Sequence, residues 1–137
     1  LNTGHKGLGF IRGIGLKSGA IASSVSHDSH NIIVIGENEK DMAFAANYIV
    51  ENHGGIVVVD GGKVLASVVL EIAGIMSDEP LTKMNEELEA AKDAAFRLGV
   101  SRGIDPFMTL SFMALPVIPT LRITTRGVID VNTQQYI

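Results

Sequence analysis

The residues best suited to chemistry form one short run, Ser26-His27-Asp28-Ser29-His30-Asn31. Two imidazoles beside a carboxylate can act as acid and base near neutral pH, or offer nitrogen and oxygen ligands to a metal. The run separates two apolar stretches, so it is predicted to form a loop that leads into a strand, where folds often place reactive groups. His27, Asp28 and His30 are therefore the candidate catalytic residues.

Three interpretations of this run are compatible with its composition. It can be a hydrogen-bonded turn whose histidines are satisfied by the backbone, or a site that faces a substrate. A metal site is the third, but in an extended chain His27 and His30 would point to opposite faces. Two histidines and one aspartate in a single loop also rarely complete a site without ligands from elsewhere. The ligand count argues against a metal site within this chain, and the first two interpretations stay open.

A second polar turn, Met76-Ser77-Asp78-Glu79-Pro80, lies where a predicted strand gives way to the longest predicted helix. Ser and Asp are favoured at helix N-caps, so capping by Ser77 or Asp78 explains the turn without any function. A role in binding is the alternative.

The sequence lacks several other catalytic motifs. The glycine pairs do not follow the strand, glycine-rich turn and helix order of a phosphate-binding loop, and no Gly-x-Ser-x-Gly elbow occurs. The cysteine motif of cytidine-type zinc deaminases is missing because the chain has no cysteine. His5 and His53 are expected to be exposed or to cap a helix end.

Composition narrows the function further. The 137 residues are predicted to form one domain, and 46% of them are hydrophobic, which excludes whole-chain disorder. A net charge of −4, with 11 basic residues in no cluster, argues against nucleic-acid binding. The lack of cysteine fits the cytoplasm, and no apolar run reaches the ~18 residues of a membrane helix. Because the chain starts in mid-pattern at Leu1, we expect it to be part of a longer polypeptide.

Short apolar runs punctuated by glycine predict strands in the first half of the chain. Residues 10–16 and 19–25 are two such runs, and Lys17-Ser18-Gly19 between them predicts a hairpin. Residues 31–36 form a continuous apolar run that ends in glycine, which is typical of a central strand buried on both faces.

The middle of the chain combines a helix with a second hairpin. Asn38 is the predicted N-cap of a helix, because apolar residues from Met42 to Ile49 recur at three- and four-residue spacing, and the glycines after His53 end it. Residues 56–59 and 64–70 are apolar runs separated by Asp60-Gly61-Gly62-Lys63, the composition of a tight hairpin turn.

The last third begins with the longest predicted helix, from Leu81 after Pro80 to Leu98 before Gly99. Residues 106–119 concentrate apolar side chains between prolines, so they should be buried in this domain or against another. Residues 121–124 and 127–131 are predicted to close the sheet as short strands. The fold class that results is α/β in the mixed α+β sense, a layered mixed β-sheet with two main helices.

Three blocks of the sequence resemble the C-terminal domain of bacterial and archaeal adenine deaminases of the amidohydrolase superfamily. They are residues 19–36, residues 74–80 and residues 105–119, and they occur in the same order along nearly the whole chain. This domain follows a (β/α)8 barrel in that family.

The resemblance implies a parent enzyme that hydrolyses adenine to hypoxanthine and ammonia in purine salvage. In that family the barrel carries one or two divalent metals, manganese, iron or zinc, on histidine and acidic ligands. A barrel takes ~250 residues, so it does not fit in this chain. The metal is therefore expected in the absent barrel, none is predicted in this chain, and the isolated domain is expected to be inactive.

The resemblance leads to the hypothesis that this domain covers the active-site face of the barrel and that the 26–31 loop completes the purine pocket. Asp28 would accept a hydrogen bond from the exocyclic amine or transfer a proton, and His27 or His30 would donate to a ring nitrogen. Side chains such as Met76 and Phe112 would contact the flat base. The candidates for substrate binding are Ser26, Asn31, Met76, Ser77, Asp78, Glu79, Phe107, Met108 and Phe112.

Two other functions stay open. The domain can be a non-catalytic assembly module in which residues 106–119 are buried against the barrel or a sister chain and the loop histidines are structural. It can also be a free-standing hydrolase with a metal on His27, Asp28 and His30. The expected partners are adenine, the barrel domain of the same parent and further copies in a homo-oligomer.

Overall fold

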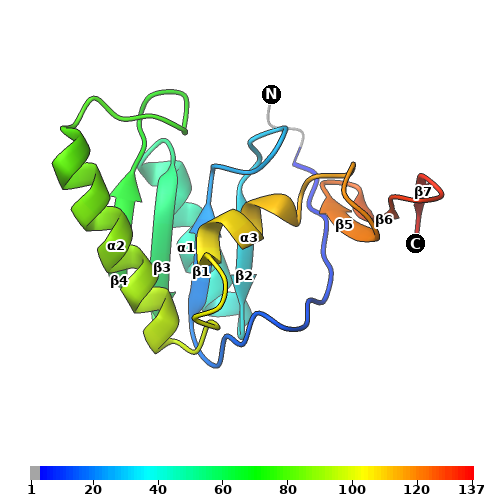
Figure 1. Cartoon of the computed structure of the whole chain (residues 1–137), viewed down its shortest axis with the longest axis horizontal. Coiled ribbons are helices and arrows are strands. Elements are labelled where there is room, and N and C mark those ends of the chain that lie inside the picture. Colours follow the sequence, from blue (N-terminus) through cyan, green and yellow to red (C-terminus); the bar gives the residue numbers. More distant parts are fainter. Residues whose placement is uncertain (1–3) are drawn as a thin grey trace.

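The computed structural model describes residues 4–137 and contains two separate sheets and three helices (Figure 1). In chain order the elements are β1 (Ala20–Ser23), β2 (Ile33–Gly36), α1 (Glu39–Glu51), β3 (Gly55–Asp60), β4 (Lys63–Val69), α2 (Leu81–Arg97), α3 (Pro106–Phe112), β5 (Leu121–Thr124), β6 (Gly127–Asp130) and β7 (Gln135–Tyr136). The mixed α+β class predicted from the sequence is confirmed, and every pairing between these strands is antiparallel.

The larger sheet has the strand order β2-β1-β3-β4 and is covered on both faces. Because side chains alternate along a strand, Val57 and Val59 face α1 and pack with Ala45 and Ile49. Their neighbours on β3, Ile56 and Val58, belong to the cluster on the other face, with the helices α2 and α3. The core therefore has two layers of apolar side chains, one on each side of the sheet.

The predicted hairpin of residues 10–16 with 19–25 is wrong, because only the second run forms a strand, β1. Residues 4–16 form an extended N-terminal arm, which is anchored by the bond from Lys17 N to the Leu98 carbonyl and that from Ser101 N to the Ile14 carbonyl. Two reasons explain the difference. β1 already pairs with β2 on one side and β3 on the other, and Gly13 and Gly15 have φ values of 99° and 88°, which do not suit a strand.

Residues 31–36 do not form the predicted central strand. β2 is an edge strand, and all four of its residues are only half-buried. β1 and β3 take the central places, and the six residues of β3, Gly-Ile-Val-Val-Val-Asp, are buried except for the last. An apolar run indicates burial but not which strands lie beside it, so a central and an edge position in the sheet could not be distinguished from composition.

The prediction that residues 121–131 close the main sheet is also wrong. β5 and β6 form a separate three-stranded sheet with β7, an element that the sequence pattern did not indicate. The chain leaves α3 through a series of turns over residues 113–120 that carry it to one end of the molecule (Figure 1).

The predicted helices and the second hairpin are confirmed. Asn38 caps α1 by accepting a bond from Asp41 N, and the helix ends at Glu51 before His53-Gly54-Gly55. β3 and β4 are joined at Gly61-Gly62, where both φ values are positive, as a tight antiparallel turn requires. None of the helices in residues 4–137 is long and apolar enough to cross a bilayer.

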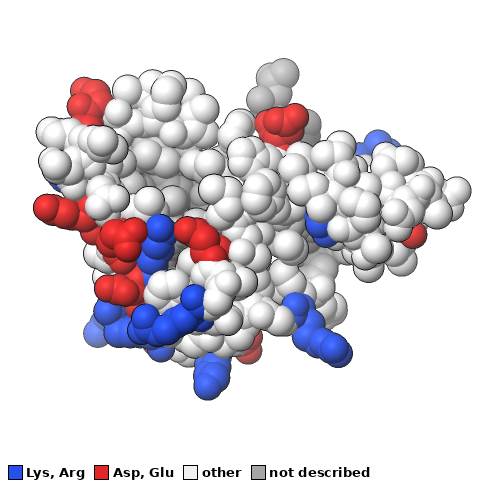
Figure 2. Space-filling view, in the orientation of Figure 1, with Lys and Arg blue, Asp and Glu red and all other residues white. Residues whose placement is uncertain are grey.

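Charged side chains gather on one part of the molecule. Figure 2 shows acidic and basic groups over α2, whereas the surface over α3 and the small sheet carries few of them. The apolar segment 106–119 lies in this second region. Its helix α3 buries Phe107 and Leu110, but Val117 in the turn that follows is 71% exposed. Only the first half of the segment is therefore buried within the described chain.

Asp41 ties the start of α1 to the β3–β4 turn. Its buried carboxylate accepts bonds from Gly62 N at 2.8 Å, Asn38 Nδ2 at 2.9 Å and Gly61 N at 3.2 Å. The bond from the Asn38 side chain, followed by those from the two glycines, lowers the pKa of Asp41 below its ordinary value of 3.8. The folded state therefore favours the charged carboxylate.

Replacing this carboxylate should destabilise the chain in a pH-dependent way. A folded-state pKa below the unfolded value adds stability above the unfolded pKa, and this stability is lost as the pH falls through the folded pKa. We therefore expect Asp41→Ala to lower the free energy of unfolding near pH 7 and the difference from wild type to shrink below about pH 4. Urea unfolding at pH 7 and pH 3 measures this, with the exposed Asp93→Ala as control. A difference that does not change with pH would contradict the proposed role of the charge.

Candidate functional site

Both polar turns lie at the same edge of the main sheet. β1 and β4 are each antiparallel to β3, so they run in the same direction and end at the same edge. The 26–31 loop follows β1 and the 76–79 turn follows β4 (Figure 1). The sequence pattern did not indicate this neighbourhood, because it depends on the order of strands in the sheet.

The 26–31 loop is closed by hydrogen bonds among its own residues and presents its central side chains to the surface. Ser26 is fully buried and its Oγ donates to the Asn31 carbonyl at 2.6 Å, while His30 N donates to the Ser26 carbonyl at 2.8 Å. Asn31 Nδ2 donates to Ser29 Oγ at 2.7 Å. Asp28 and His30 are exposed, and His27 is half-buried. The hydrogen-bonded turn and the exposed site are thus features of the same loop.

His27 joins the loop to α3. Its ring stacks on the ring of Phe112, the last residue of α3, with centroids 5.4 Å apart and an interplanar angle of 23°. The centroid of the His30 ring lies 6.1 Å from that of the His27 ring. Met108 lies one helical turn before Phe112 and so shares its side of the helix. The structure thereby brings together candidates that are about 80 residues apart in sequence.

Phe107 is not part of the surface that His27 and Phe112 share, and the 76–79 turn lines a separate cleft. Phe107 is 5% exposed and belongs to the hydrophobic cluster under α3, so it does not reach the surface that His27 and Phe112 share. Met76 is exposed. The expectation that Ser77 or Asp78 caps α2 is wrong, because the N-cap is Pro80 and no side chain bonds to the first turn. The pyrrolidine ring provides a preset φ but no capping oxygen.

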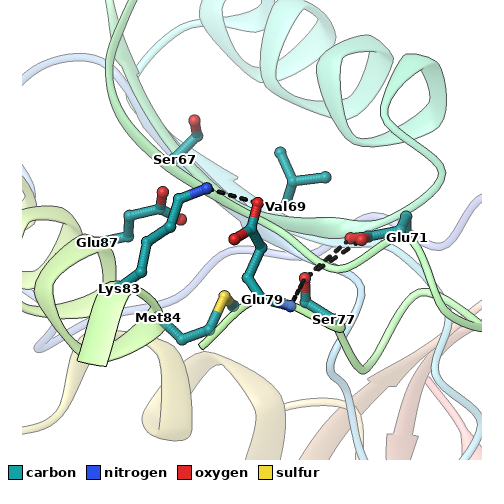
Figure 3. A pocket seen from close by; sticks show the side chains of 8 residues that line it. All are labelled: Ser67, Val69, Glu71, Ser77, Glu79, Lys83, Met84 and Glu87. Atoms are coloured by element: carbon teal, nitrogen blue, oxygen red, sulfur yellow. Dashed lines mark hydrogen bonds and ion pairs between the residues drawn. The ribbon is translucent and has the colours of Figure 1, made fainter. Parts of the chain in front are cut away.

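Ser77 and Glu79 line a cleft of about 390 Å³ between β4 and α2 (Figure 3). Ser77 Oγ lies 3.2 and 3.3 Å from the two carboxylate oxygens of Glu71, and Lys83 Nζ lies 2.6 Å from a Glu79 oxygen. Lys83 has a raised pKa, chiefly through this bond to Glu79. The other residues that line the cleft are Ser67, Val69, Met84 and Glu87, so no residue of the 26–31 loop faces the cleft.

Ser24 connects the bases of the two turns, and sequence reasoning did not find it. Its buried Oγ donates to the Gly74 carbonyl and accepts a bond from Gly55 N at 2.7 Å. Gly54 must lack a side chain here, because a Cβ would lie 2.3 Å from Gly74 Cα. The segment after β4 is therefore held against the end of β1, two residues before the loop begins.

The loop residues do not form a metal centre. Within residues 4–137, no three or more histidine, aspartate or glutamate side chains converge in a group that could hold a metal ion. The interpretation of a free-standing hydrolase with a metal on His27, Asp28 and His30 thus does not fit the geometry. His5 and His53 are exposed, and His53 follows the end of α1 with its N–H donating to the Val50 carbonyl, as expected.

Comparison with known proteins agrees with the resemblance. The family model described as "Adenine deaminase C-terminal domain" matches residues 1–135. The chain belongs to this family. The curated adenine deaminase of Desulfatibacillum aliphaticivorans is 48% identical over 135 residues, which cover 98% of this chain and 24% of that protein. The adenine deaminase of Brucella anthropi is 52% identical over 134 residues, with the same coverage, and that of Bacillus subtilis is 47% identical over 131 residues. This adenine deaminase C-terminal domain thus spans about a quarter of the length of these relatives.

Removal of the Ser24 hydroxyl should loosen both turns together. Ser24→Ala leaves the buried Gly55 N–H and Gly74 carbonyl without this partner, so the free energy of unfolding should fall by about 1–3 kcal/mol. Hydrogen exchange should accelerate in residues 26–31 and 71–77 alike. Ser101→Ala, at an exposed serine, is the control. Faster exchange in only one of the two turns would contradict the connection.

Proposed function

We propose that this domain belongs to a cytoplasmic enzyme that hydrolyses adenine to hypoxanthine and ammonia in purine salvage, and that it covers the active site of a barrel domain in the rest of the polypeptide. The observation that carries the proposal is that the loop with the exposed Asp28 and His30 and the half-buried His27 lies beside Phe112 at one surface of the domain. Family membership supports the choice of adenine, because the curated relatives carry that name.

Asp28 is the residue best suited to read the 6-position of the purine. Adenine carries an amine there, which donates hydrogen bonds, whereas hypoxanthine carries a carbonyl, which accepts them. A carboxylate accepts from the amine and is unfavourable beside the carbonyl, so Asp28 would favour substrate over product. It would also be placed to take the proton that the attacking water releases and to pass it to the departing amino group, which leaves as ammonia. His27 and His30 would donate to ring nitrogens.

Phe112 and Met108 would provide the apolar wall for the base. The His27–Phe112 stack presents flat rings at the surface, and aromatic rings bind purines through stacking. Ser26 and Asn31 would shape the loop through the bond between them, and Phe107 would support α3 from the core. Met76, Ser77, Asp78 and Glu79 remain candidates for the rim of the site on the β4 side.

The divalent metal, manganese, iron or zinc, is proposed in the barrel domain. In this proposal the activated water belongs to the barrel domain, because no three histidine, aspartate or glutamate side chains converge within residues 4–137. This chain would contribute recognition and proton transfer, and it would have no activity alone. Assembly into a homo-oligomer is part of the same proposal.

Asp28→Asn in the complete enzyme tests the recognition of the amine. The amide keeps the size of the side chain but loses the charge and half of the accepting capacity, so kcat/KM for adenine should fall at least tenfold, or about 1.4 kcal/mol. Asp93→Asn on the exposed side of α2 should leave it unchanged. A value within twofold of wild type for a folded Asp28→Asn enzyme would refute the role of this carboxylate.

Phe112→Ala tests the apolar wall. Loss of one stacking partner costs about 1–3 kcal/mol, so kcat/KM should fall roughly 5- to 150-fold, and KM should rise because the base binds less well. Phe44→Ala is a matched control, since Phe44 on α1 is 38% exposed and Phe112 is 36% exposed. Equal effects of the two substitutions would show that Phe112 acts only through stability.

A further inference from the structure

The described chain has more surface than a compact protein of its size. Its accessible surface is 8374 Å², whereas a monomer of 14.5 kDa is expected to have about 6,900 Å², a difference of roughly 1,500 Å². A stable interface takes about 800 Å² from each partner. The excess is therefore large enough to hold an interface.

The first part of the N-terminal arm, residues 4–12, turns its apolar side chains outward, whereas Ile14 and Leu16 are buried in the core. Gly7 and Gly9 face the small sheet, because a Cβ on Gly7 would lie 1.7 Å from the Thr124 carbonyl oxygen and one on Gly9 would lie 3.0 Å from the Val128 side chain. In an extended chain the residues between them point away. Accordingly Leu8 is 80% exposed and Phe10 is fully exposed. Over residues 7–10, glycine faces protein and large apolar residues face solvent, the reverse of a surface that remains in water.

A second exposed apolar segment lies at the same end of the molecule. Residues 113–121 contain no charged side chain, and Val117, Ile118 and Leu121 are exposed. Figure 2 shows few charged groups over this part of the face. The arm and this segment both contact the small sheet, because Gly9 approaches Ile123, and Ile123 N donates to the Met113 carbonyl at 2.9 Å. We call residues 4–12 and 113–121 together the docking surface.

The docking surface adjoins the candidate site. Met113 follows Phe112 directly, and the Phe112 ring stacks on His27. A body that covered the docking surface would thus lie next to the loop that carries Asp28.

We infer that the docking surface is the contact with the polypeptide that precedes this domain. The inference rests on the proposed function, since it names the surface through which the domain would be seated on the barrel. In the curated relatives about three quarters of the protein lies outside the matched region, and the family model is that of a C-terminal domain, so the arm leads directly to the preceding part. A covalent link of this kind gives the preceding part a high effective concentration at the arm. A second copy of the chain has no such advantage.

Photo-crosslinking in the complete polypeptide tests the contact. Benzoylphenylalanine replaces Phe10 and, in a matched control, Leu81, which is 84% exposed at the start of α2. Irradiation should join residue 10 to a peptide of the preceding part of the same chain, at least tenfold more than residue 81. Links between two copies, or equal yields at the two positions, would overturn the inference.

Hydrogen exchange of Phe10→Ser in the complete polypeptide provides a second readout. Amides of residues 113–131 should exchange at least tenfold faster than in wild type, and Leu81→Ser should have no such effect. Unchanged exchange would also overturn the inference. Neither measurement uses activity, so the two proposals can fail separately. Full activity of Asp28→Asn together with the expected crosslink would reject the proposed function alone. The expected loss of activity in Asp28→Asn without a crosslink from residue 10 would reject the docking surface alone.

Discussion

The site depends on the burial of β1 on both faces and along both edges. All four residues of β1 are buried, and the strand pairs with β2 and β3 at once. Ala20 and Ala22 are small enough to let α1 pack closely on one face, while Ile21 fills the core on the other. The end of β1 cannot move without breaking two ladders of hydrogen bonds. The 26–31 loop begins three residues later, and Ser24 extends this rigidity to the segment after β4.

The sequence predicted the local structure of the chain well and its long-range pairing poorly. α1, α2 and the β3–β4 hairpin followed from the Asn38 cap, the helical periodicity and the Gly61-Gly62 turn, all of which act within a few residues. Three features depend on which strands pair with one another: the place of β2 at an edge, the small second sheet and the unpaired arm. An apolar run carries no information on that choice, because it specifies burial without naming a partner.

The same limit applies to the candidate site. His27, Asp28 and His30 could be selected from their side-chain chemistry, but the stack of His27 on Phe112 joins residues about 85 positions apart. Phe107 and Phe112 look alike in the sequence, yet one lies in the core and the other at the surface, because α3 is amphipathic and only one side of it meets the sheet. Ser24 gave no signal, since a serine in a strand is not distinctive until its partners are known.

A loop that serves a pocket formed elsewhere must meet two requirements that conflict within one small domain. Its side chains must be exposed when the domain is considered alone, yet their positions must be fixed, because ordering them on binding would cost free energy. The Ser26–Asn31 and His30–Ser26 bonds meet the second requirement with the Ser26 hydroxyl and backbone groups, which leaves the Asp28 and His30 side chains free to point outward. What is still free to move is the whole domain, relative to the preceding part of the polypeptide. A docking surface beside the loop removes this freedom, and the outward Leu8 and Phe10 of the arm are the residues placed to do so.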